Sequence, residues 1–186
     1  FFVEGDCAAM ILSEVERLEL LDHGVPVEVY TDPALKFSKK TYLKFLRVLQ
    51  KKNLIRFCTS VKCRVGTFFV KKKNGTIRWI VDARSTNAQF REPPGISLAS
   101  PEALGRIEAD SSRELFTAKA DVDNFFLRLR IPLELSRWFA LAPIRAGDLG
   151  IGFTDDGPVD PDTLIYPCCA TLPMGFSWAM FLAQSV

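Results

Sequence analysis

One stretch of the sequence restricts the local fold more than any other: VGTFFVKKKNGTIRWIVDAR, which begins at Val65. The dipeptide Asn74-Gly75 lies between two runs rich in β-branched and aromatic residues, and it favours the tight turns that join antiparallel strands. We therefore predict a β-hairpin with strands at about residues 65–72 and 76–83. Because side chains alternate along a strand, Arg78 is predicted to point away from the face that carries Trp79.

The basic residues are concentrated around this hairpin. Between Lys36 and Arg91, sixteen Lys or Arg residues accompany a single acid, Asp82, whereas the rest of the chain holds eight Lys or Arg and 21 Asp or Glu. A block of one sign in an otherwise acidic chain indicates a polyanionic partner, such as nucleic acid or nucleotides. An ordinary solvated surface is the alternative for the block, and protection of an exposed strand edge is the alternative for Lys71, Lys72 and Lys73.

The remaining pattern predicts helices and further strands. Apolar residues at helical spacing predict helices at about residues 7–21 and 38–52, the second capped by Ser38. Ser100 and Pro101 predict the start of a short helix. In that helix Leu104 and Ile107 are expected to face inward. Three more strands are expected at residues 115–122, 137–144 and 163–173.

Composition sets the class of protein. The 186 residues, 48% of them hydrophobic, suffice for one sizeable core. No apolar run approaches the roughly 20 residues of a membrane helix and no leader precedes the first helix, so we expect no membrane partner. The five cysteines follow no disulfide framework, and Cys58, Cys63 and the single His23 make a poor zinc site. We expect an intracellular protein, nuclear or cytoplasmic, without structural zinc. Since the sequence starts at Phe1 and ends in a run typical of a helix, we interpret it as part of a longer protein.

The stretch ADVDNFFLRLRIP carries the strongest candidate for a metal ligand. If a strand ends near Asp121, its alternation exposes that carboxylate, while Asp123 and Asn124 form the turn that follows. Mg²⁺ binds through one or two protein carboxylates together with substrate phosphates, so Asp121 is a candidate ligand. An ordinary turn is the alternative. Asp155 and Asp156 are interpreted only as the tip of another hairpin.

Three motifs in order resemble the reverse transcriptases, the RNA-directed DNA polymerases of retroelements. FFVKKKNGTIRWIVDARSTNAQF is similar to the fingers hairpin of that family. ADVDNFFLRLRIP resembles its first palm motif, with Asp121 at the catalytic carboxylate and Phe126 at the aromatic position. LPMGFSWAMFLAQ is similar to the L-P-x-G motif and the helix after it. The residues in register are Lys71, Lys72, Gly75, Arg78, Asp82, Arg84, Asn87, Leu172, Pro173, Gly175 and Gln184.

The resemblance, which spans about residues 40–186, implies how a nucleotide and metal ions are held. Asp121 would bind the two catalytic Mg²⁺ (or Mn²⁺) ions, with help from the backbone carbonyl of Val122. Lys72 or its neighbour Lys71, together with Arg78, would grip the triphosphate of a deoxynucleoside triphosphate. The partners would be that nucleotide and an RNA or DNA template with its primer.

The resemblance also implies how the sugar and the template are recognised. Phe126 would be a steric gate whose ring excludes the ribose 2′-hydroxyl. Met174, where the family often has glutamine, and Gly175 would line the nucleotide pocket. Gln184 would lie toward the template.

The implied architecture is an α+β polymerase fragment. Residues 1–110 would form a fingers-like region of helices plus the basic hairpin at about 65–84, and residues 111–186 a partial antiparallel palm sheet with helices on one face. The sequence ends before the family's Tyr-x-Asp-Asp hairpin, so two-metal nucleotidyl transfer is expected in the complete protein and not in these residues alone. Two alternatives stay open: a non-catalytic nucleic-acid-binding remnant of a retroelement, and a basic protein-interaction domain.

Overall fold

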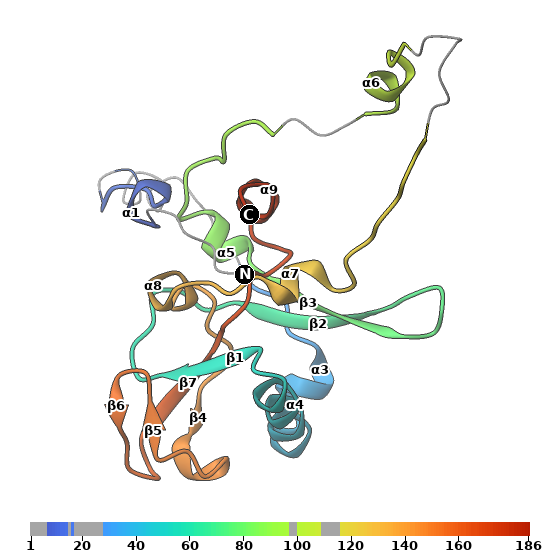
Figure 1. Ribbon diagram of the computed structural model, residues 1–186. Coiled ribbons are helices and arrows are strands. Elements are labelled where there is room, and N and C mark those ends of the chain that lie inside the picture. The colour runs from blue at the N-terminus through green and yellow to red at the C-terminus, as the bar shows by residue number, and fades with distance from the viewer. Residues whose placement is uncertain (1–6, 15, 17–27, 97–99, 109–115) are drawn as a thin grey trace.

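The computed structural model describes residues 7–14, 16, 28–96, 100–108 and 116–186. Over these residues the protein belongs to the mixed α+β class, with short helices and antiparallel strands (Figure 1). The helices are α1 Cys7–Met10, α3 Pro33–Lys36, α4 Lys39–Lys51, α5 Arg84–Asn87, α6 Pro101–Gly105, α7 Phe125–Arg128, α8 Leu133–Ser136, the 3-10 helix η1 Ala146–Asp148, and α9 Ala179–Gln184. The strands are β1 Ile55–Cys58, β2 Gly66–Lys71, β3 Ile77–Asp82, β4 Ile144–Arg145, β5 Phe153–Thr154, β6 Gly157–Pro158 and β7 Leu164–Cys169.

Helix α4 confirms the prediction for residues 38–52. The hydroxyl of Ser38 accepts a hydrogen bond from the Thr41 amide at 3.3 Å, which satisfies one of the free donors at the helix start. One side of the helix is buried against the rest of the protein. The residues buried on that side are Tyr42, Leu46 and Leu49.

The β2–β3 hairpin is confirmed as well. The two strands pair antiparallel along their whole length, and Gly75 in the turn has a φ of +82°, a left-handed conformation that glycine adopts without strain. Phe69 of β2 and Trp79 of β3 meet Phe45 of α4 edge-on, with ring centroids 5.4 and 5.9 Å apart. The middle of the hairpin is therefore fixed to α4 by aromatic packing.

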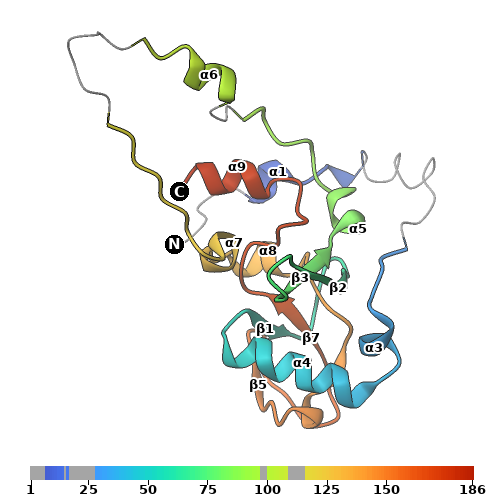
Figure 2. The same ribbon diagram turned by 90° about the vertical axis from the view of Figure 1, so that its right-hand side faces the viewer.

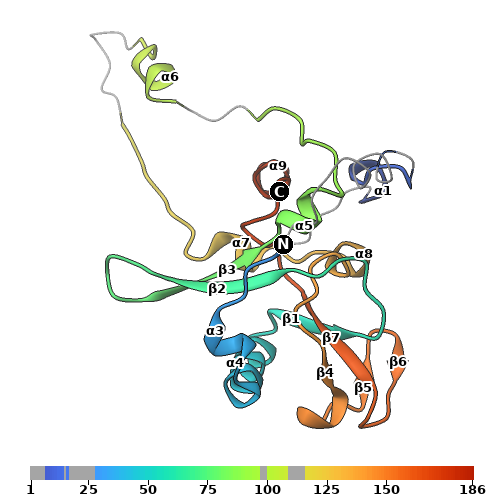
Figure 3. The same cartoon turned by 180° about the vertical axis from the view of Figure 1, so that it is seen from behind.

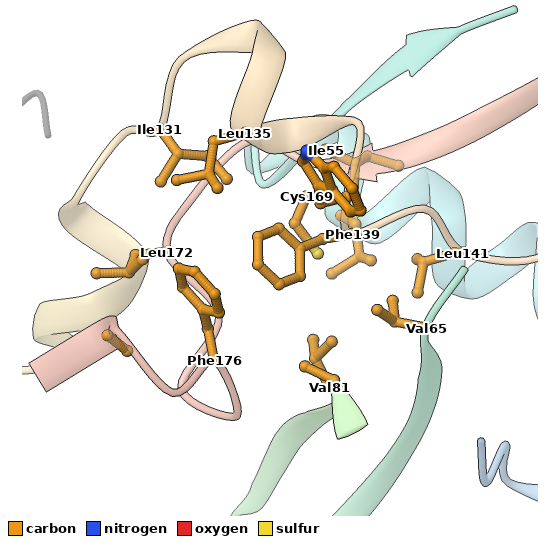
Figure 4. Packing of buried hydrophobic residues seen from close by; sticks show 14 of the residues in the cluster. Ile55, Val65, Val81, Ile131, Leu135, Phe139, Leu141, Cys169, Leu172 and Phe176 are labelled. Atoms are coloured by element: carbon orange, nitrogen blue, oxygen red, sulfur yellow. The ribbon is translucent and has the colours of Figure 1, made fainter. Parts of the chain in front are cut away.

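A second sheet joins distant parts of the chain in the order β1-β7-β4. β1 lies in the first third of the sequence and β7 near its end, so both halves contribute to one sheet and one core. Phe139 is fully buried at the centre of this core, and its ring lies 4.9 Å from that of Phe176 (Figure 4). Val81 of β3 points into the same cluster, which joins the hairpin to it.

Two of the predicted strands are wrong or shorter than predicted. Residues 116–122 form no strand, because no strand of the described residues pairs with them, and Phe116 is 84% exposed. Residue 115 lies outside the described residues. Of residues 137–144, only the end enters β4, while Ala140 makes isolated bridges to Arg64 and Cys168. The strand predicted at 163–173 is confirmed as β7.

The predicted first helix is interrupted. Helix α1 ends at Met10 because the chain then pairs with another segment: Ile11 bridges Phe90, and the Leu12 amide donates to the carbonyl of Gln89 at 3.0 Å. These tertiary hydrogen bonds replace those that would continue the helix. Helical residues recur at 14 and 16, and residues 17–21 of the prediction lie outside the described residues.

In the 91–122 segment, the described residues 92–96, 100–108 and 116–122 lead away from the body of the protein in every view (Figures 1, 2 and 3). Within it α6 forms as predicted, and the Ser100 hydroxyl accepts from the Ala103 amide at 3.2 Å. The inward orientation expected of its apolar residues is wrong, because both are about 60% exposed: Leu104 60% and Ile107 59%. No helix of the described residues is both long and apolar enough to cross a membrane.

Candidate functional site

The hairpin displays its basic residues to solvent. Lys71 ends β2 and Arg78 lies on β3 opposite Val70, and both basic side chains are exposed, as predicted for Arg78. Lys72 in the turn is half-buried. Because β2 and β3 form a sheet of two strands, both are edge strands. The exposed lysines are therefore consistent with protection of a strand edge as well as with ligand binding.

The loop that carries Met174 and Gly175 lies directly on strand β3. A Cβ atom added to Gly175 would overlap the carbonyl oxygen of Val81, so only glycine fits this position. The next residue, Phe176, is buried in the core. Gly175 therefore allows its loop to approach the protein's own hairpin closely. The resemblance had implied that Gly175 allows the backbone to approach the base and sugar of a nucleotide. Met174 is 45% exposed beside it.

Asn87 holds this loop in place. Its side-chain amide donates to the Gly175 carbonyl at 2.9 Å, and its carbonyl oxygen accepts from the Ser177 amide at 3.0 Å. The sequence indicated Asn87 only as a position in a motif. The signal that could have revealed this role is the short distance in sequence between β3 and Asn87. Helix α5 begins two residues after β3 ends, and Asn87 at its end lies beside the Gly175 loop.

Asp82, which is buried at the end of β3, forms a clasp with Arg84, whose side chain is 60% exposed. The Arg84 guanidinium donates to both carboxylate oxygens, at 2.6 and 2.8 Å, and the Tyr30 amide donates a third bond at 2.7 Å. These hydrogen bonds outweigh burial and lower the pKa of Asp82 from 3.8 to about 2. The carboxylate is thus fully engaged, and it orients the hairpin against residues 28–32.

Helix α7 carries Phe126. Asp123 and Asn124 form the predicted turn, and Asn124 adopts the left-handed conformation with φ +52°. Phe126 is half-buried, packs against the core and lies edge-on to Phe125 with 5.9 Å between centroids. The chain after α7 is hydrogen-bonded to the chain before Met174. The bond is from the Leu172 amide to the Leu129 carbonyl, 2.9 Å long.

The predicted metal ligands are not assembled. Asp121 and Val122 lie in the exposed, extended end of the 91–122 segment, without the strand on which the prediction placed them. Among the described residues, no group of three or more His, Cys, Asp or Glu side chains could hold a metal ion. Among the described residues, the Gly175 loop lies on strand β3, which carries Arg78, and Phe126 packs against the core that both share.

Comparison with known proteins adds no family. No protein-family model matches the chain, and no curated protein matches it. The three motifs and their arrangement are therefore what bears on function.

The second hairpin, the cysteines and Gln184 lie away from this surface or at its margin. Asp155 and Asp156 form the tip between β5 and β6, as predicted. The Arg137 guanidinium lies 2.5 Å from the Asp156 carboxylate and holds the pKa of that carboxyl well below its usual range. The five cysteines, all of which are described, form no disulfide with one another. Gln184 is the last residue of α9 and is exposed.

Sequence reasoning missed a cleft on another side of the protein. It has a volume of about 920 Å³ and lies between α3, the start of α4 and the segment around β4. None of the residues predicted to bind nucleotide or metal lines it. The signal that could have found the cleft is weak, because its walls come from five separate stretches of the sequence.

Proposed function

We propose that this chain is the fingers and part of the palm of a reverse transcriptase. The complete protein would extend a primer on an RNA or DNA template by adding deoxynucleotides. The observation that carries the proposal is the contact between Gly175 and Val81. Through it the loop of the third motif lies on the strand of the first motif that carries Arg78, which supports assigning residues of both motifs to one nucleotide site.

The proposal gives each residue of this surface a role. The cations of Lys71, Lys72 and Arg78 would bind the triphosphate, because flexible or planar cationic groups neutralise phosphate oxygens and Arg does so in a bidentate manner. Phe126 would select against ribonucleotides, and Met174 would contact the nucleotide. Gln184 remains the candidate contact to the template.

The described residues do not by themselves form a two-metal centre. Asp121 is one carboxylate in an exposed segment, and two like-charged ions need carboxylates that converge from separate elements. We therefore propose that Mg²⁺ (or Mn²⁺) is held in the complete protein with Asp121 and the Val122 carbonyl among several ligands. The 186 residues alone should not polymerise DNA.

Nucleotide binding by the chain itself tests the hairpin. Arg78→Ala should weaken binding of a fluorescent deoxynucleoside triphosphate by roughly tenfold, since a charged hydrogen bond contributes about 1.5–3 kcal/mol. Arg106→Ala is the matched control, because Arg106 is an exposed arginine in the 91–122 segment. Equal losses in the two variants would show that the protein responds only to total charge and would contradict the proposal.

The catalytic carboxylate is tested in a longer protein that polymerises. Asp121→Asn should abolish synthesis and leave primer–template binding and the unfolding temperature unchanged, because Asp121 is exposed. Loss of folding together with activity would instead indicate a structural role. Phe126→Val should admit ribonucleotides, with Phe125→Val as the control for the neighbouring ring.

A non-catalytic nucleic-acid-binding protein is the second candidate. The observation that favours it is the exposed basic face of α4, which displays Lys40, Lys44 and Lys51 without needing any metal site. Binding to primer–template that rises on addition of deoxynucleotide favours the polymerase. Equal affinity for heparin and primer–template, with no response to nucleotide, favours a basic surface that binds any polyanion or an acidic protein.

A further inference from the structure

The cleft beside α3 has the lining of a ligand site. Its volume of about 920 Å³ is ample for a single nucleotide and falls within the range of small-molecule pockets, roughly 300–1,000 Å³. Its floor is apolar and fixed. Its buried apolar residues are Leu35, Tyr42, Val65 and Ile144, which belong to the core cluster, and the polar Thr67 is buried beside them.

The rim of the cleft is positively charged. Four Lys or Arg residues line it against two acids, Glu28 and Asp148. Two of these cations already have partners, since Lys39 pairs with Asp148 at 2.8 Å and Arg145 pairs with Asp162 at 3.3 Å.

The other two cations are available to a ligand. Within the part of the chain that the structure describes, Lys36 and Arg64 form no ion pair. Glu28, the remaining acid of the rim, is exposed. The cleft therefore has an excess of positive charge with two cations that no described acid neutralises.

Arg64 is held at a position where its positive charge lines the cleft. Its backbone bridges Ala140, and its carbonyl accepts a hydrogen bond from the Ser85 hydroxyl at 2.8 Å, so the position is fixed from two sides. The side chain lies close enough to the floor to affect Tyr42. Burial raises the pKa of Tyr42, and the positive charge of Arg64 opposes that rise.

An aromatic ring lies next to the second cation. Phe37 lines the cleft with 79% of its surface exposed, which is unusual for so large an apolar side chain. The Lys36 ammonium lies 5.7 Å from the centre of this ring. An exposed ring beside a free cation matches a ligand that is both planar and anionic, because a base stacks on the ring and a phosphate meets the cation.

We propose that this cleft is a second, separate nucleotide-binding site, in which Phe37 stacks on the base and Arg64 and Lys36 bind the phosphate. The ligand is a base with a phosphate, either free or as one unit of a single-stranded nucleic acid. The proposal does not depend on the polymerase assignment, because it uses none of the hairpin residues.

The test follows backbone amides on binding of named probes. Adenosine 5′-monophosphate, ribose 5-phosphate, inorganic phosphate and a six-nucleotide oligo(dA) are titrated separately into the isotope-labelled chain. The monophosphate should perturb the amides of Val65 and Ala142 at the cleft and bind more tightly than ribose 5-phosphate. Stronger binding of the oligonucleotide than of the monophosphate would identify single-stranded nucleic acid as the source, and the reverse would identify the free nucleotide.

Three variants assign the parts of the ligand. Arg64→Gln should lower affinity for both the monophosphate and ribose 5-phosphate by roughly tenfold, the usual effect of losing a charged hydrogen bond. Phe37→Ala should lower affinity for the monophosphate by about tenfold and leave ribose 5-phosphate unchanged, because only the base stacks. Lys62→Gln, which removes an equal charge two residues from Arg64 and outside the cleft, should change neither.

Other outcomes would overturn the proposal. Inorganic phosphate that binds as tightly as the monophosphate would show that the cleft recognises no base. Perturbation confined to the hairpin amides of Val70 and Ile77 would remove the cleft site and leave the proposed function intact. A short poly-glutamate peptide that competes as well as oligo(dA) would point to a protein partner.

Discussion

Strands were predicted both in the β2–β3 hairpin and at residues 115–122 of the 91–122 segment, yet of the described residues only the hairpin forms its strands and packs onto the body. In the hairpin, Phe69 and Trp79 have a ring of α4 to pack against. In the segment, Phe116 is 84% exposed. A local pattern therefore becomes structure only where another part of the chain supplies a surface to bury it.

The two regions differ in backbone pairing in the same way. The hairpin's strands satisfy each other's amide and carbonyl groups, and a turn with Gly75 fixes their register. Residues 116–122 have no such partner among the described strands. Substitutions should consequently be costly in the hairpin and nearly neutral in the segment.

A glycine in each region gives the largest expected contrast. A Cβ atom on Gly66 would overlap the Tyr30 carbonyl oxygen, whereas one on Gly95 would meet nothing within 4 Å. Gly66→Ala should lower the free energy of unfolding by about 3 kcal/mol, because backbone atoms on both sides cannot yield easily. Gly95→Ala should change it by less than about 0.5 kcal/mol. Chemical denaturation of both variants measures the difference, and equal stability would refute the close packing of β2.

An acid in each region gives the next contrast. Asp82→Asn should cost about 2 kcal/mol, because it leaves the Arg84 guanidinium and the Tyr30 amide poorly paired. Asp123→Asn, in the turn after the segment, should have little effect on stability. Urea denaturation of the two variants at neutral pH is the measurement.

The Asp82 clasp also predicts a pH dependence. The pKa of Asp82 is lowered from 3.8 to about 2, so folding favours its charged form. Its contribution to stability is fully present above about pH 4 and is lost as the pH falls toward 2. Unfolding followed between pH 5 and 2 should be less steep in Asp82→Asn than in the unsubstituted protein. Identical profiles would mean that the clasp is absent in solution.

A phenylalanine in each region gives a smaller difference. Phe69→Ala removes a half-buried ring that packs on Phe45, and it should cost about 1–2 kcal/mol, less than for a fully buried ring. Phe116→Ala should be neutral within about 0.5 kcal/mol, since its ring is exposed. Thermal unfolding of the pair is the measurement. A large loss in Phe116→Ala would show that the segment packs against something in solution.

The smallest effect is expected in α6. Leu104→Ser replaces a side chain that is 60% exposed and should leave stability within about 0.5 kcal/mol of the unsubstituted protein. A clear destabilisation would instead support the inward orientation that the sequence predicted.

Features set by neighbouring residues were predicted well. The cap at Ser38, the cap at Ser100 and the turn at Gly75 depend on hydrogen bonds or backbone angles within a few residues. Arg78 is exposed as predicted, but the reason is its place near the turn, because burial along β3 increases from Ile77 to Asp82 and does not alternate. Features that require a distant partner were not predicted, among them the end of α1 where Ile11 bridges Phe90.

The features of the candidate site likewise separate into those set by local sequence and those set by contacts with distant residues. The sequence by itself determined which residues carry charge, where the hairpin turns, and the order of three motifs similar to those of reverse transcriptases. Only the tertiary structure decided that Gly175 lies on Val81 and that Asn87 holds its loop, because both contacts join residues about 90 positions apart. It also decided that Asp121 lies exposed rather than on a strand. The physical reason is that caps and turns are satisfied by local atoms, whereas strand pairing and burial need a partner whose position the local sequence does not encode.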